Sequence, residues 1–388
     1  MSRDTHRPAD GELLGIPMAA NARIDVYSGV ARLAGKLWAS RHRAQAGRSE
    51  TAVVVVHPSS NFLGHYLLAP LAALGVDAIG LNTRYIANDS ALIMENCVLD
   101  VGAAVAYLRA QGYQRIVLVG NSGGGGLVAM YQSQAESPTI RATPAGDPPD
   151  LTTAHLPAVD AVVELMAHPG RAIVYTEWLD PAIVEESQPL ARAPDLDMFG
   201  GTNGPPYDAA FVDRYRGAQL ARNRRITSWV RGQLALLQRS TGGAVGDLPF
   251  VVHGTVADLR FLDLAIDPSD RATGTLWGDP FQANLMPATL GHLTSLRSWL
   301  SQWSIDDSEC HGPRHLARVS VPVLVVYGTG DTACFPSHAR ALYDAVAHDR
   351  KELIAVPGAG HYFQNQPALM FETAEHIVGW LRRYDAVR

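Results

Sequence analysis

The sequence of 388 residues is poor in cysteine and contains no long apolar run. Its three cysteines, Cys97, Cys310 and Cys334, are odd in number and lack CxxC spacing, which disfavours a disulfide framework or a zinc site. No 18 apolar residues follow one another, and the first 23 residues lack the apolar segment of a secretory signal. We therefore expect reduced thiols in a soluble, cytoplasmic chain without membrane insertion.

The chain also has few charged residues for its length. They make up 18% of the sequence, and the formal net charge is −6, so no basic surface is expected that would attract a phosphate backbone. We therefore predict no nucleic-acid partner. The 47% of hydrophobic residues suffice for one large core but not for two independent ones, which predicts a single enlarged domain. The composition leaves the oligomeric state open.

Short apolar runs alternate with longer helical patterns, which is typical of an α/β fold with a parallel sheet covered by helices. Near-continuous apolar runs of this kind are typical of strands buried on both faces. One helix is indicated by Val98, Val101, Val105 and Leu108 at helical spacing, and Gly112 ends it. Strands are predicted at residues 52–57, 76–81, 115–120, 161–166, 321–327 and 352–356, and further helices near 337–349 and 374–384.

The alternation stops after the strand predicted at 161–166 and resumes only near residue 321. The intervening stretch of about 150 residues is too long for a loop. We therefore predict a large, mainly helical cap at residues 170–316, inserted into a core made of residues 24–169 and 317–388. Residues 1–23 are polar and charged, and we expect them to form a flexible segment ahead of the core.

The segment GNSGG follows the strand predicted at 115–120 and precedes a helical run. It places Ser122 between Gly120 and Gly124, which is the G-x-S-x-G pattern of a nucleophile elbow. The backbone N–H of Gly123, at the start of the helix, is expected to point into the same space as the serine hydroxyl and to stabilise negative charge there.

Two more glycines, Gly125 and Gly126, follow this pattern. They leave room beneath an acyl group, or they allow a close helix contact. The sequence favours neither explanation.

A serine hydroxyl is a weak nucleophile unless a base lies within hydrogen-bond reach and a third group orients that base. Asp331 lies in the glycine-rich turn YGTGD after the strand predicted at 321–327, from where a carboxylate can face the serine. His361 lies in the loop GAGHYF after the last predicted strand. Glu164, inside the strand at 161–166, is the rival acid.

With these segments in this order, the chain resembles the α/β-hydrolase superfamily over about residues 24–170 and 317–388. The resemblance implies Ser122 as nucleophile, His361 as general base and then acid, and Asp331 as the residue that orients the imidazole. It implies a mostly parallel sheet flanked by helices, and no cofactor. Capped members mostly hydrolyse esters, thioesters, lactones, amides or activated C–C bonds of small molecules. Serine at the elbow argues against haloalkane dehalogenase or epoxide hydrolase chemistry, which uses a carboxylate nucleophile.

The loop after the strand at 52–57 departs from the family pattern. Members commonly have His-Gly there, whereas this chain reads HPSSNFLGHY from His57. Pro58 has no N–H. We therefore expect the second oxyanion donor, after Gly123, to be the backbone N–H of Ser59, with Ser60 as the alternative.

Other histidines near predicted strand ends, His57, His65 and His168, are expected to be polar structural or pocket-lining residues. The pair His311 and His315 encloses a glycine and a proline, which disfavour the helix that would bring both rings to one face. No further ligands stand at suitable spacing, so we predict no metal site.

The cap is expected to set specificity. In the segment LTSLRSWLSQWS, Trp299 and Trp303 fall on one helical face, and such a stripe fits either the core of the cap or the wall of a substrate pocket. With Asn121 beside the nucleophile, these two tryptophans are candidate substrate-binding residues, and they favour a fairly hydrophobic substrate.

We therefore predict a serine hydrolase of the carboxylesterase type that cleaves an ester bond of a small molecule through an acyl-enzyme on Ser122. The alternatives with the same triad are a thioesterase, a lactonase and a C–C bond hydrolase. More distant alternatives are an acyltransferase and a non-catalytic binding protein. Another cap helix has a basic face, either solvated or able to bind an anionic acyl carrier such as a CoA thioester, formed by Arg222, Arg224, Arg225 and Arg231.

Overall fold

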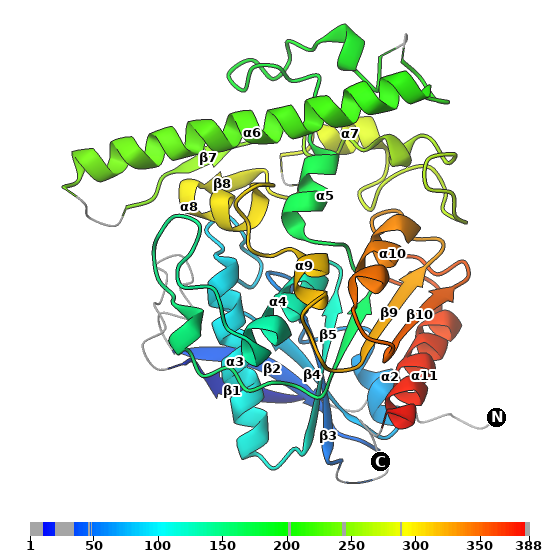
Figure 1. Ribbon diagram of the computed structural model, residues 1–388. Helices are drawn as coiled ribbons and strands as arrows, with labels where there is room; N and C mark the ends of the chain where they lie inside the picture. Colours follow the sequence, from blue (N-terminus) through cyan, green and yellow to red (C-terminus); the bar gives the residue numbers. More distant parts are fainter. Residues whose placement is uncertain are drawn as a thin grey trace.

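The computed structural model describes residues 11–19, 35–45, 47, 49–200, 203–242, 246–287 and 289–384 (Figure 1). The strands of its large sheet are β1 (Glu12–Pro17), β2 (Lys36–His42), β3 (Thr51–His57), β4 (Asp77–Asn82), β5 (Arg115–Asn121), β6 (Ala161–Leu165), β9 (Val323–Gly328) and β10 (Lys351–Val356). Within the described residues they pair in the order β1-β2-β4-β3-β5-β6-β9-β10. The pairs β1–β2 and β2–β4 are antiparallel, and the other neighbours are parallel. The predicted mostly parallel sheet is confirmed.

Helices cover both faces of this sheet. They are α2 (Leu68–Ala73), α3 (Met94–Ala110), α4 (Gly124–Glu136), α9 (Gly312–Leu316), α10 (Pro336–Ala345) and α11 (Pro367–Arg383). In β3, the side chains of Val53 and Val55 pack with α2 and α11, whereas Val54 and Val56 pack with α3 and α4. Successive side chains of a strand point to opposite faces, so a strand between two helical layers needs a continuous apolar run.

The start of the chain differs from the prediction. We expected residues 1–23 to be a flexible segment ahead of a core that begins at residue 24, but residues 12–17 form β1, which pairs with β2. Leu14 and Ile16 of β1 are buried in the sheet core. The prediction failed here because only alternate residues of this short edge strand are buried, so no continuous apolar run marks it. Residues 1–10 and 20–23 lie outside the described residues.

Between β6 and β9 the chain leaves the large sheet. This insertion contains α5 (Arg171–Trp178), α6 (Ala209–Ser240), β7 (Pro249–Val251), α7 (Pro280–Asn284), β8 (Leu293–Ser295) and α8 (Leu296–Ser298). Figure 1 shows the long α6 lying across the top of the molecule, beyond the upper end of the sheet. Part of the insertion has a hydrophobic core of its own, in which Tyr175 and Trp299 are completely buried.

The predicted domain limits at residues 170 and 316 stay a prediction. Helix α9, which the prediction assigns to the cap, packs on the sheet side of the molecule, where Leu316 shares a core cluster with Ala129 of α4 and Leu342 of α10. Among the helices of the described ranges, none has the length and the apolar character that a membrane crossing requires.

Candidate active site

A tight turn between β5 and α4 presents Ser122. This residue has φ of +56°, a strained left-handed conformation for a residue with a side chain. A Cβ atom at Gly120 would lie 2.5 Å from the carbonyl oxygen of Gly124, and one at Gly124 would lie 2.1 Å from that of Val56. Both positions therefore require glycine. The Ser122 N–H donates to the carbonyl of Leu165 at 3.1 Å, and the residue stays partly exposed.

Gly125 and Gly126, the two further glycines, allow neighbouring side chains to pack closely against the start of α4. A Cβ atom at Gly125 would lie 2.2 Å from Oε2 of Glu164, and one at Gly126 would lie 3.0 Å from Sγ of Cys310. These neighbours occupy the positions that larger side chains would need, which supports the explanation of a close helix contact. Both carboxyl oxygens of Glu164 are buried without a hydrogen-bond partner in the described residues, and burial raises the pKa of this carboxyl to about 8. Glu164 therefore does not orient the histidine of the site.

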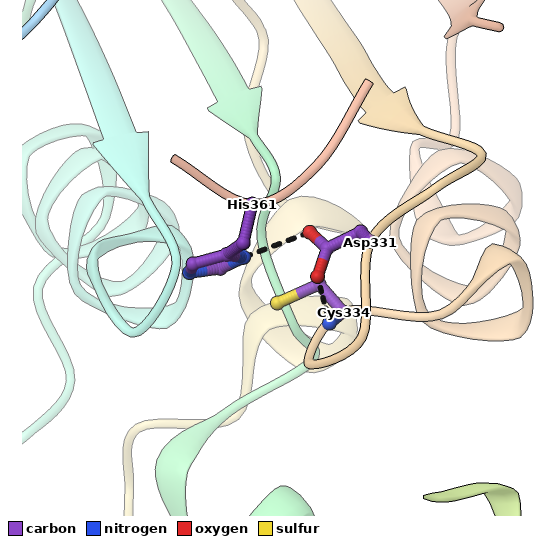
Figure 2. A group of neighbouring side chains, drawn as sticks. All are labelled: Asp331, Cys334 and His361. Atoms are coloured by element: carbon purple, nitrogen blue, oxygen red, sulfur yellow. Dashed lines mark hydrogen bonds and ion pairs between the residues drawn. The ribbon is translucent and has the colours of Figure 1, made fainter. Parts of the chain in front are cut away.

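Asp331 and His361 form a buried pair. Oδ2 of Asp331 lies 2.7 Å from Nδ1 of His361, and both side chains are almost completely buried. Oδ1 of Asp331 accepts hydrogen bonds from the backbone N–H groups of Ala333 at 2.7 Å and Cys334 at 3.0 Å. Figure 2 shows the carboxylate held between the imidazole and this turn. Because Oδ1 is fixed by the backbone, Oδ2 is left to orient the ring.

The other ring nitrogen of His361 has no fixed partner. Its Nε2 atom is buried and makes no hydrogen bond to any described residue, Ser122 included. The Ser122 hydroxyl instead makes a hydrogen bond to the thiol of Cys334. Burial raises the pKa of this thiol well above its ordinary value, and the hydrogen bond lowers it in part. The three predicted residues come from the ends of β5, β9 and β10, and the thiol of Cys334 lies beside Asp331 and His361.

The ligand atoms of Asp331, Cys334 and His361 lie within 4.8 Å of one another, which is close enough to hold a metal ion. The residues fit a metal poorly as they stand. The carboxylate is already bonded to the imidazole and to two amides, and burial keeps the thiol protonated by raising its pKa. We interpret the group as a hydrogen-bonded pair with a neighbouring thiol.

The loop after β3 does not offer the backbone donor that the sequence predicts. The N–H groups of Ser59 and Ser60 both donate to Nδ1 of His57, at 3.1 Å and 2.9 Å. Neither is therefore directed at an oxyanion in this conformation, and the expectation of Ser59, or of Ser60, as second donor is not met. The prediction could not foresee that the preceding ring would accept both amides. Gly123 lies at the start of α4, where N–H groups have no partner within the helix.

The residues predicted to bind substrate are all buried. Asn121 is 1% exposed, and its amide group bonds to Leu165, Tyr66 and His65. Trp299 and Trp303 are both 0% exposed. The prediction that these three residues contact substrate is therefore wrong for this structure, because the tryptophan stripe faces the core of the insertion and not a pocket.

The basic face of α6 is neutralised by acidic side chains. Arg222 and Arg225 pair with Glu186, and Arg224 and Arg231 pair with Asp306 and Asp307 respectively. These pairs occupy the guanidinium groups that an anionic acyl carrier would need.

A cavity of about 200 Å³ opens beside His361. Its wall combines the insertion with the loops that follow β9 and β10, so the insertion reaches the site from this side. The lining residues include Thr275, Leu276, Thr332, Tyr362, Gln364 and Gln366.

Comparisons with known proteins return structural neighbours only. No protein-family model and no curated protein matches the sequence. Among solved structures, the esterase domain of a Rhodothermus marinus protein is 13% identical, with 96% of this chain and 98% of that chain covered and a TM-score of 0.48. Est1E from Butyrivibrio proteoclasticus is 12% identical, with 95% and 99% covered and a TM-score of 0.47. A monoacylglycerol lipase from Paleococcus ferrophilus is 16% identical, with 90% and 99% covered and a TM-score of 0.45.

The class of the protein follows from its own topology and site. The sheet order, a serine at a strained turn after β5, an aspartate after β9 and a histidine after β10 define the α/β-hydrolase fold.

Proposed function

We propose that the chain is a serine hydrolase that cleaves an ester-type acyl bond of a small molecule, with Ser122 as nucleophile. The observation that carries this proposal is the buried hydrogen bond between Asp331 and His361, which leaves Nε2 of the imidazole without a hydrogen-bond partner. A buried imidazole in this arrangement can take a proton at Nε2 while the carboxylate stabilises the positive ring.

The proposed reaction begins when the Ser122 hydroxyl turns from Cys334 toward Nε2 of His361. Oγ attacks the carbonyl carbon, its proton moves to Nε2, and the negative charge collects on the carbonyl oxygen. The bond to the leaving group then breaks, and the departing alcohol takes the proton from Nε2. Water repeats the sequence on the acyl-enzyme, releases the acid and restores Ser122.

The substrate is proposed only as a small molecule with an acyl carbonyl. The inference of a fairly hydrophobic substrate rested on Trp299 and Trp303, and both are buried in the insertion. The cavity beside His361 is lined by threonine and glutamine side chains as well as by Leu276. The division into core and cap, and the cytoplasmic location, stay predictions of the sequence.

The test is covalent labelling. We expect a small fluorophosphonate to modify Ser122 of the folded protein, as read by peptide mass spectrometry, and p-nitrophenyl acetate to be hydrolysed. The Ser122→Ala variant should lose both the labelling and the ester hydrolysis. Ser240→Ala, at the exposed end of α6, is the matched control and should retain both. A folded wild type that is neither labelled at Ser122 nor active on the ester would overturn the proposal.

A further inference from the structure

Two histidine rings flank the residue that follows the nucleophile. Because Gly123 has no side chain, the space beside it is open to its neighbours. A Cβ atom at this position would lie 2.8 Å from Nε2 of His57 and 3.5 Å from Nε2 of His168. His57 is the last residue of β3 and His168 follows β6, so the rings approach from the strands on both sides of β5. Both Nε2 atoms therefore lie close to Gly123, next to the turn that presents Ser122.

The hydrogen bonds at Nδ1 fix where each ring carries its proton. Nδ1 of His57 accepts the N–H groups of Ser59 and Ser60, and Nδ1 of His168 accepts the N–H of Gly170 at 3.3 Å. A nitrogen that accepts such bonds carries no hydrogen, so a neutral ring must carry it on Nε2. Both Nε2 atoms therefore present N–H groups, and neither has a partner among the described residues.

Both rings are held in the neutral form. Desolvation, together with the positive charge of Arg171, keeps the pKa of His57 well below its ordinary value. Desolvation lowers the pKa of His168 to about 3, with a further contribution from His338. A neutral ring with an accepting Nδ1 and a protonated Nε2 has no free lone pair. Neither ring can therefore act as the base for Ser122, whereas both can donate a hydrogen bond.

We propose that Nε2–H of His57 replaces the missing backbone donor of the oxyanion hole, with Nε2–H of His168 beside it and the N–H of Gly123 as the third donor. This inference rests on the proposed function, because it requires an oxyanion at Ser122. The inference follows from the altered loop after β3. Pro58 has no N–H, and the N–H groups of Ser59 and Ser60 already donate to Nδ1 of His57 and position its ring. The loop after β3 thus supplies its oxyanion donor through the side chain of His57 and not through its backbone.

Two substitutions of His57 separate a catalytic role from a structural one. Asparagine places an amide oxygen near the position of Nδ1, where it can still accept the loop amides, but it has no donor near Nε2. Glutamine places an amide N–H near Nε2 but loses the acceptor at Nδ1. If His57 only holds the loop, His57→Asn should be the better enzyme. If His57 donates to the oxyanion, His57→Gln should be the better enzyme.

The measurement is the hydrolysis of p-nitrophenyl acetate by the full chain, with unfolding midpoints in parallel. We expect His57→Asn to lower kcat about a hundredfold with KM nearly unchanged, because the lost interaction exists only in the transition state. His57→Gln should recover part of kcat despite a lower midpoint, and His168→Asn should show a smaller loss. His315→Asn on α9, another buried histidine whose Nε2 bonds to the Glu309 carbonyl, is the control and should keep kcat.

Three outcomes overturn the proposal. The first is a His57→Asn variant within about threefold of wild-type kcat in a protein that is labelled at Ser122. The second is a His57→Asn variant that is more active than His57→Gln. The third is a wild-type protein that is neither labelled at Ser122 nor active on the ester. This result would overturn the proposed function as well, and the wild type alone shows it, without any variant. If the His57→Asn variant does not fold, the kcat values of His57→Gln and His168→Asn decide whether the proposal stands.

Discussion

Nδ1 of His361 lies 2.7 Å from Oδ2 of Asp331, and less than 2% of either side chain is exposed. The carboxylate accepts only, so the proton between the two groups belongs to Nδ1, and Nε2 keeps its lone pair. The relationship is the reverse of that in His57, whose Nδ1 accepts and whose Nε2 carries the proton. The imidazoles of His361 and His57 thus have opposite capacities at Nε2, the first as acceptor and the second as donor.

Asp331→Asn is predicted to reduce activity strongly without unfolding the protein. The asparagine amide can donate to Nδ1, which moves the ring proton to Nε2 and blocks the acceptance of the serine proton. We expect kcat, and the rate of fluorophosphonate labelling, to fall by about 10⁴. Asp344→Asn on the exposed part of α10 is the matched control and should label at the wild-type rate. Labelling of Asp331→Asn at the wild-type rate would show that Asp331 does not orient His361.

Gly125→Ala is predicted to destabilise the fold, because its Cβ atom would lie 2.2 Å from Glu164 and 2.7 Å from Ala167. We expect the free energy of unfolding to fall by roughly 1–3 kcal/mol, as for other overpacked cores. Gly232→Ala, in the exposed interior of α6 with nothing within 4 Å, is the control. It should raise the free energy of unfolding by about 0.5–1 kcal/mol. Urea unfolding of both variants measures the difference, and equal effects would contradict the close packing.

Glu164→Gln is predicted to change how stability depends on pH. The carboxyl has a pKa of about 8 in the folded chain and an ordinary value of 4.5, so the folded state binds its proton more tightly than the unfolded state. Between these values, wild-type stability should fall as the pH rises, by up to about 1.4 kcal/mol per pH unit relative to Glu164→Gln. Below pH 4.5 this dependence should vanish.

The measurement for Glu164→Gln is urea unfolding at several pH values from 4 to 8. Glu375→Gln, at an exposed position of α11, serves as the control and should follow the wild type. Parallel curves for wild type and Glu164→Gln would show that Glu164 is ionised in the folded chain.

The central strands were predictable because strands buried on both faces leave continuous apolar runs, as Val53 to Val56 do in β3. Edge strands leave no such signal. In β1 the side chains of Leu14 and Ile16 face the core while their neighbours are more exposed, and six residues are too few for this alternation to stand out.

The positions of Ser122, Asp331 and His361 were predictable because each residue has a local signal: glycines around Ser122, and glycine-rich turns after strands for Asp331 and His361. The rest of the site depends on contacts between distant segments. The direction that Trp299 faces is set by its packing against Tyr175, and the loss of the Ser59 donor is set by the orientation of the His57 ring. No pattern within a single segment records either fact.

The strand β1 has a consequence for how the protein is handled. A shortened chain that begins at residue 24 would lose β1, which pairs with one edge of β2, and with it Leu14 and Ile16 from the core cluster that contains Leu37 and Ala39. The free edge of β2 would then present unpaired N–H and C=O groups to any other chain in solution. Such a shortened chain should self-associate through this edge, so expression for crystallisation is best started before Glu12.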